Sequence, residues 1–221
     1  MNGSFLRIAA LMAVGCPAML GTTVTMSFNN NSFPTGSIGP YIATVNGTQD
    51  FVFCDDDTHS VYPNETWQAT VTSLSSLIAL GNTNIASSSV LWKNLPSALT
   101  LYEQAAWLVN EFGTHSMDAS GIQNAIWDIF LQKTGSGSNS DQTTDSYWLL
   151  QASNNYKTLT SAQIASAEIL SPIAGTQSGG YGLPQEFITL TPEPATYVLF
   201  GAGVILLGIG SFRRTAQKDA A

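Results

Sequence analysis

Residues 41–54 read YIATVNGTQDFVFC, two short runs rich in β-branched and aromatic residues on either side of Asn46-Gly47. Such runs favour β-strands, because their side chains pack well on a pleated surface. Asn-Gly is the dipeptide that most favours a two-residue turn between antiparallel strands. The sequence therefore predicts a β-hairpin with strands at 41–45 and 50–54, and this hairpin ends at Cys54.

Further strands are expected on both sides of the hairpin. TVTMSF at 23–28 and TWQATVT at 66–72 have the same composition, and Gly and Pro residues separate them from the hairpin. QEFITL at 185–190 has it again near the other end of the chain. We expect a group of N-terminal strands and one closing strand.

The middle of the chain is predicted to be helical. One helix has apolar residues at helical spacing between Pro96 and Gly113: Leu101, Ala105, Leu108 and Phe112. A second, capped by Asp118 or Ser120, has its own apolar face: Ile122, Ala125, Ile126, Ile129 and Phe130. A third is expected at 147–156, and Thr160 with Gln163 forms a capping box before a fourth. The predicted fold class is α+β, with N-terminal strands followed by a helical block and a closing strand.

Charge is scarce and strongly negative. The whole chain carries −8, and residues 22–191 contain 13 acidic and 3 basic side chains, a net charge of −10. The negative field would repel a phosphate backbone, so nucleic acid is excluded as a partner.

The N-terminus has the layout of a secretory signal peptide. Arg7 precedes an apolar run at 8–20, which is followed by small residues. The run is too short to span a bilayer comfortably. Residues 1–21 are therefore predicted to be a signal peptide, and residues 22–190 an exported ectodomain.

The C-terminus has the layout of a membrane anchor. Pro192-Glu193-Pro194 precedes eighteen uncharged residues at 195–212, and Arg213-Arg214 follows at once. A helix of that length would span about 27 Å, close to the thickness of the hydrocarbon layer. The arginines favour the cytoplasmic side, so the ectodomain would lie outside the cell. We expect one transmembrane helix within a tail at 191–221.

This tail resembles the PEP-CTERM sorting signal of bacterial proteins, a Pro-Glu-Pro triplet followed by a transmembrane helix and an arginine cluster. The resemblance implies recognition by an exosortase-type membrane enzyme and a place at the cell envelope or cell surface. Proteins with this signal are often linked to extracellular polysaccharide, which is one partner the resemblance implies.

Only two cysteines exist, and Cys16 lies in the predicted signal peptide. Removal of that peptide would leave Cys54 without a disulfide partner, which is unusual in an oxidising compartment. Cys54 follows Phe53 at the end of a predicted strand. Gln123 lies in IQNAIWDIF, after Ile122 and before two hydrophobic residues, Ile126 and Trp127.

These two motifs resemble the thioester domains of bacterial surface adhesins, in which a Cys and a Gln side chain condense with loss of ammonia. The resemblance implies a thioester between Cys54 and Gln123, and the bond could acylate an amine or hydroxyl group on a partner surface. A thioester needs protection from water, and the expected pocket residues are Phe53, Ile122, Ile126 and Trp127. Asp55 departs from the family pattern, which has a hydrophobic residue after the Cys.

Other interpretations of Cys54 remain open. It could be a buried apolar residue in a structural envelope or matrix protein, since free Cys is often buried. It could be a hydrolase nucleophile paired with His59 or His115, but no hydrolase signature surrounds it and the neighbouring aspartates disfavour a thiolate.

Asp55-Asp56-Asp57 with His59 could bind Ca²⁺ or another metal ion, although a solvated acidic turn is favoured. No cofactor motif is recognised, and the chain is predicted not to be an enzyme.

Overall fold

The computed structural model describes residues 21–33, 38–135, 137 and 140–191. They form six strands: β1 (Thr22–Ser27), β2 (Tyr41–Val45), β3 (Thr48–Cys54), β4 (Thr66–Ser73), β5 (Ala167–Pro172) and β6 (Phe187–Leu190). They also form five α-helices: α1 (Leu74–Asn84), α2 (Ala98–Phe112), α3 (Ala119–Leu131), α4 (Asp145–Asn155) and α5 (Ser161–Ser166). Three short 3₁₀ helices follow α1, α2 and α4, namely η1 (Ile85–Ser87), η2 (Ser116–Asp118) and η3 (Tyr156–Thr158).

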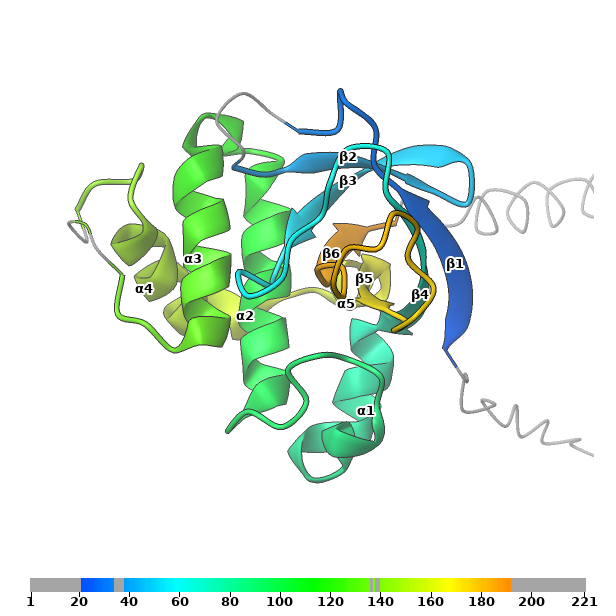
Figure 1. The fold of residues 1–221 in the computed structure, drawn as a ribbon. Coiled ribbons are helices and arrows are strands. Elements are labelled where there is room, and N and C mark those ends of the chain that lie inside the picture. Colours follow the sequence, from blue (N-terminus) through cyan, green and yellow to red (C-terminus); the bar gives the residue numbers. More distant parts are fainter. Residues whose placement is uncertain (1–20, 34–37, 136, 138–139, 192–221) are drawn as a thin grey trace, which may run out of the picture.

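The six strands close into an antiparallel barrel in the order β1-β2-β3-β6-β5-β4 (Figure 1). β1 closes the barrel, because it pairs with β2 through Met26 and Ser27 and with β4 along its whole length. A closed sheet leaves no edge strand with unpaired backbone groups.

The predicted hairpin is confirmed. β2 and β3 pair from Tyr41 opposite Val52 to Val45 opposite Thr48, so Asn46 and Gly47 form the turn. Asn46 has φ 49° and Gly47 has φ 85°, and the favoured hairpin turn requires positive φ at both positions.

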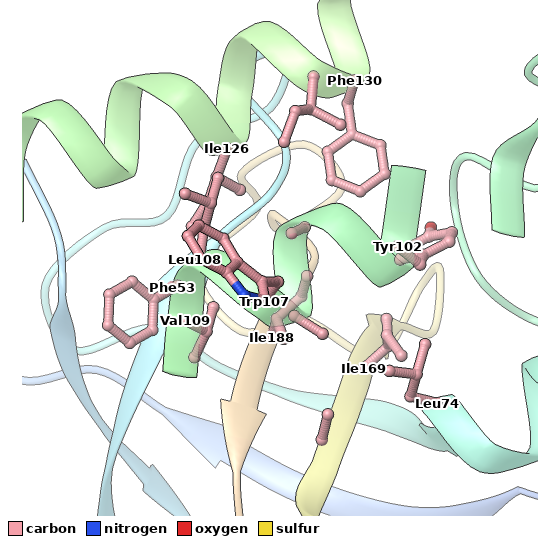
Figure 2. Close-up of a cluster of buried hydrophobic side chains, with 14 of the residues drawn as sticks. Phe53, Leu74, Tyr102, Trp107, Leu108, Val109, Ile126, Phe130, Ile169 and Ile188 are labelled. Atoms are coloured by element: carbon pink, nitrogen blue, oxygen red, sulfur yellow. The ribbon is translucent and has the colours of Figure 1, made fainter. Parts of the chain in front are cut away.

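Helices α2, α3 and α4 pack side by side beside the barrel, and α1 lies at one end of it (Figure 1). Alternation along β3 decides which residues face which layer. Val52 and Cys54 belong to the cluster of buried residues inside the barrel. Phe53 points the other way and packs with residues of the helices, including Val109 and Ile126 (Figure 2). Cys54 therefore lies at the end of a strand with its side chain directed into the barrel.

The predicted fold class is wrong. The expectation was N-terminal strands, a helical block and a closing strand, plus one C-terminal transmembrane helix. Instead β6 pairs with β3, and an unexpected strand, β5, pairs with β4 and β6, so the strands form a closed barrel. The fourth helix expected after Thr160 is short, since α5 ends at Ser166 and β5 begins at Ala167.

Among the described residues, no helix has both the length and the apolar composition needed to cross a bilayer. The predicted signal peptide at 1–21 lies outside the described residues except for its last residue. The predicted helix at 195–212 and the predicted sorting motif, Pro192, Glu193, Pro194, Arg213 and Arg214, lie wholly outside them.

Candidate functional site

The side chain of Gln123 lies against the backbone of Cys54. The Gln123 Nε2 donates a hydrogen bond to the Cys54 carbonyl oxygen at 2.5 Å, although the two residues are 69 positions apart in the chain. Both are fully buried. The Gln123 Oε1 is buried too and accepts no hydrogen bond from the described residues. A buried carbonyl oxygen without a hydrogen bond costs free energy, and this cost calls for an explanation.

The Cys54 thiol is held by the loop that follows β3. The thiol donates to the Asp56 carbonyl oxygen at 3.1 Å, and the Asp56 N–H donates to the sulfur at 3.3 Å. Burial raises the pKa of the Cys54 thiol well above its ordinary value. The thiol is therefore protonated at neutral pH.

Trp127 partly opposes this effect on the thiol. Its indole N–H lies close enough to the sulfur to lower the thiol's pKa, although the geometry falls short of a full hydrogen bond. Trp127 follows Gln123 by four positions in α3, so both side chains lie on one helix face. That face covers Cys54, because Trp127 packs against the barrel cluster to which Cys54 belongs.

The other three residues expected to form the pocket lie elsewhere. Phe53, Ile122 and Ile126 belong to the cluster between the barrel and the helices. Their packing holds α3 against β3. They do not belong to the barrel cluster, which contains Cys54 and against which Trp127 packs. Of the four predicted residues, Trp127 is the one that the structure brings next to the thiol.

Gly39 covers the Gln123 carboxamide from the other side. A Cβ atom built on Gly39 would overlap the Gln123 Oε1 and would lie 3.2 Å from the Gln123 Cδ. It would also lie 3.3 Å from a ring carbon of Tyr41. Only a residue without a side chain fits this close approach, and sequence reasoning did not single out Gly39.

Asp56 and His59 organise the same loop. The Asp56 carboxylate is fully buried and bonds to the His59 Nδ1 at 2.6 Å and to the Thr58 hydroxyl at 2.6 Å. Gln185 Nε2 donates to the Asp56 carbonyl oxygen at 2.7 Å. Of the two histidines named as possible partners of Cys54, His59 lies in the loop that holds the thiol. His115 lies between Glu111 and Asp118 at the end of α2.

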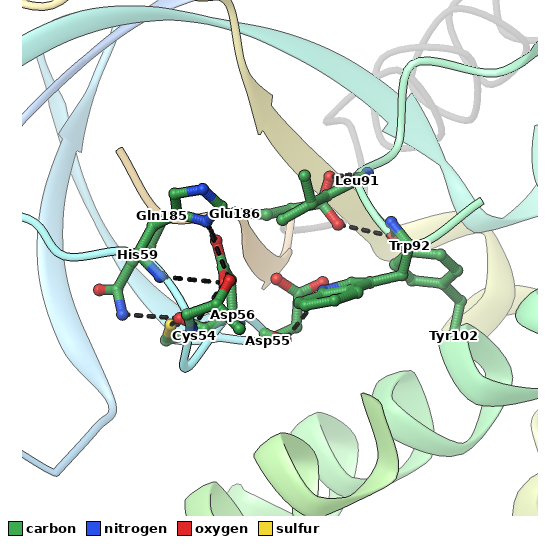
Figure 3. Close-up of polar contacts among 10 residues, drawn as sticks. Cys54, Asp55, Asp56, His59, Leu91, Trp92, Tyr102, Gln185 and Glu186 are labelled. Carbon is green, nitrogen blue, oxygen red and sulfur yellow. Dashed lines mark hydrogen bonds and ion pairs between the residues drawn. The ribbon is translucent and has the colours of Figure 1, made fainter. Parts of the chain in front are cut away.

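Asp55 points toward a second buried carboxyl group, that of Glu186. Figure 3 shows Cys54, Asp55 and Asp56 between His59 and Gln185 on one side and Trp92 and Tyr102 on the other. Tyr102 Oη donates to one Glu186 oxygen at 2.6 Å. The Leu91 N–H donates to the other at 2.7 Å.

Neither Asp55 oxygen has a hydrogen bond of full geometry with the described residues. Burial raises the pKa of Asp55 well above its ordinary value, and the Glu186 charge raises it further. Burial also raises the pKa of Glu186. The solvated acidic turn predicted for residues 55–57 is therefore wrong for Asp55 and Asp56, which are fully buried, and only Asp57 is exposed.

Metal binding gains no support from this loop. No three acidic, His or Cys side chains of the described residues come together in a way that could hold a metal ion. A scan of protein-family models and searches of curated proteins and of solved structures return no match to this chain.

Proposed function

We propose that Cys54 and Gln123 condense to an internal thioester, and that the protein, once exported, uses this bond to attach itself covalently to a partner. One observation carries the proposal. The carboxamide of Gln123 is fully buried against Cys54, with its carbonyl oxygen unpartnered among the described residues. The hydrogen bond from Nε2 ties α3 to β3, but this structural role does not account for the burial of the Gln123 carbonyl oxygen without a partner.

Formation of the bond needs no cofactor. The Cys54 sulfur adds to the Gln123 Cδ, the thiol proton passes to the amide nitrogen, and ammonia leaves as the C–S bond forms. The thiol already sits in fixed hydrogen bonds with Asp56, so its position is set before the reaction.

The surroundings favour a long-lived bond. Both residues are inaccessible to solvent, which keeps water from the acyl carbon. A thiol with a raised pKa is a poorer leaving group, so hydrolysis slows further. When a partner amine attacks Cδ, an amide forms and the Cys54 sulfur is released, and the Trp127 N–H lies where it would stabilise the departing thiolate.

The test is the intact mass of the purified protein before and after treatment with methylamine. We expect a mass short by one ammonia, which rises by one methylamine as a thiol becomes titratable in the denatured protein. Peptide mapping should place the added methylamine on Gln123 and the thiol on Cys54.

Two variants serve as controls. Cys54→Ala and Gln123→Ala should each have the full mass expected from their sequence and take up no methylamine. A wild-type protein of full mass, with a free Cys54 and no methylamine uptake, would rule the thioester out.

The second candidate is a structural envelope or matrix protein in which Cys54 is only a buried apolar residue. The packing of Cys54 among apolar barrel residues favours it. It predicts the full mass and no reaction with amines, so the same measurement separates the two functions.

A further inference from the structure

Two hollows of the surface are each lined by a residue that lies beside the buried Cys54–Gln123 pair. One is lined in part by Trp127, on the sulfur side. The other is lined in part by Gly39, which covers the Gln123 carboxamide. A nucleophile must reach the acyl carbon, which is the Gln123 Cδ, and not the sulfur. The Gly39 side is therefore the direct approach for a partner.

The hollow beside Gly39 is an apolar groove of about 510 Å³, which we name the Phe51 groove. Apolar side chains dominate its lining: Ile38, Pro40, Ile42, Phe51, Phe112 and Met117. Met117 is 94% exposed, and Phe51 is 56% exposed although it lies on a strand. Large apolar side chains gathered in one exposed place mark an interaction surface.

Charge around the groove indicates the kind of partner. No charged side chain of the described residues lines it. Acidic residues are direct sequence neighbours of two lining residues, since Asp50 precedes Phe51 and Asp118 follows Met117. None of the basic residues of the stretch 22–191, Lys93, Lys133 and Lys157, lines it, and that stretch carries −10. The negative field of this stretch attracts a cation. A lysine side chain arrives as a cation, and its amine becomes a nucleophile once the ammonium group loses its proton.

We propose that the Phe51 groove docks a protein segment that carries a lysine between apolar or aromatic residues, and that it delivers the lysine amine past Gly39 to the acyl carbon of Gln123. The apolar neighbours bind in the groove, and the amine forms an amide with Gln123 while Cys54 regains its thiol. This inference rests on the proposed thioester and adds the surface that selects the partner.

The experiment compares two blocked peptides, one with lysine between two phenylalanines and one with lysine between two serines. Their amines have matched reactivity, so a difference in rate reports binding of the neighbours. We expect the aromatic peptide to react with the wild-type protein roughly tenfold faster, followed by intact mass. Phe51→Ser and Met117→Ser should each bring the two rates together, and methylamine uptake by each variant checks that its thioester has formed.

Leu150→Ser is the matched control, because Leu150 is 41% exposed on α4 and does not line the groove. It should keep the preference for the aromatic peptide. Equal rates for both peptides, with normal methylamine uptake, would overturn the groove and leave the thioester standing. A full mass with no uptake of any amine would overturn both proposals.

Discussion

Asp55 carries a carboxyl group that no solvent reaches, beside the equally buried carboxyl group of Glu186. Two ionised carboxylates at such a place would repel each other with little screening, so the pair keeps a proton at neutral pH. The loop after β3 is held at the same residue, since the main-chain carbonyl oxygen of Asp55 accepts from Trp92 Nε1 at 3.0 Å. The residue that follows Cys54 is therefore fixed through its main chain and carries a carboxyl group close to a second buried acid.

Asp55→Asn replaces the protonated carboxyl group by a neutral group of the same shape. The folded state raises the pKa of Asp55, so the stability linked to its proton is fully present below the ordinary pKa of an Asp and is lost as pH rises toward the raised value. Each unit of that rise corresponds to about 1.4 kcal/mol. We expect the variant to match the wild type near pH 4 and to exceed it in free energy of unfolding at pH 8, measured by urea denaturation.

Asp57→Asn is the control for this experiment. Asp57 belongs to the same loop but is exposed, so its replacement removes one negative charge without touching the buried pair. It should change the stability little at either pH. If Asp55→Asn is destabilised by the same amount at pH 4 and pH 8, the pair does not hold a proton.

The sequence was informative about single residues where a motif was local. The pattern around Gln123 singled out a residue that does lie against Cys54. The run of three aspartates was misinterpreted, because burial of Asp55 depends on Glu186, which lies far along the chain on the other side of the helical block. Gly39 carried no signal in the sequence, since its role depends on a carboxamide that arrives from α3.

The end of β3, the start of α3 and the segment before β2 meet around one carboxamide. β3 supplies Cys54, α3 supplies Gln123, and Gly39 closes the contact from the third side. Neither α3 nor β3 has a glycine at the point of contact, so the space for the carboxamide comes from Gly39 in the segment before β2. The fit of Gly39 should therefore decide how precisely the Gln123 side chain is placed.

Gly39→Ala tests this fit. The added methyl group would overlap the Gln123 Oε1, so the carboxamide must turn away from Cys54. We expect a large loss of the thioester fraction, measured as the share of protein with a mass short by one ammonia. The loss of stability should be modest, about 1 kcal/mol, because the displaced group is the end of a flexible side chain.

Gly182→Ala is the matched control. Nothing lies within 4 Å of a Cβ atom at Gly182, so the variant should form the thioester as the wild type does. A Gly39→Ala protein with an undiminished thioester fraction would show that the carboxamide is not placed by this contact.

Among the helices and strands, the sequence predicted the strands that have a simple alternating pattern and the helices that have a clear apolar face. The capping box of Thr160 and Gln163 is present, but the helix that it starts has only six residues. β5 follows at once, and its apolar residues suit a strand and a helix equally in so short a run. α1 was not predicted, because it follows β4 directly with no loop between them.

The whole molecule joins a closed barrel to a layer of helices. Closure depends on β6 pairing with β3 and on β5 pairing with β4, and each of these contacts joins segments that lie far apart in the chain. Nothing local in the sequence fixes such pairings, so the barrel was not foreseen although most of its strands were. The pair of Cys54 and Gln123 lies where the two layers meet, since one residue ends a barrel strand and the other belongs to α3.

A thioester at this place would cross-link the barrel to the helices and close a loop of 69 positions in the chain. By the loop-entropy relation used for disulfides, a cross-link of that span stabilises the folded state by about 4 kcal/mol. Methylamine opens the bond without changing the sequence, so we expect the melting temperature to fall by on the order of 10 °C after treatment. Scanning calorimetry on samples of known intact mass would measure this.

Cys54→Ala should melt at one temperature with or without methylamine, which separates opening of the bond from a solvent effect. If the wild type takes up methylamine fully and its melting temperature stays the same, the bond contributes nothing to holding the two layers together, and its role is confined to attachment.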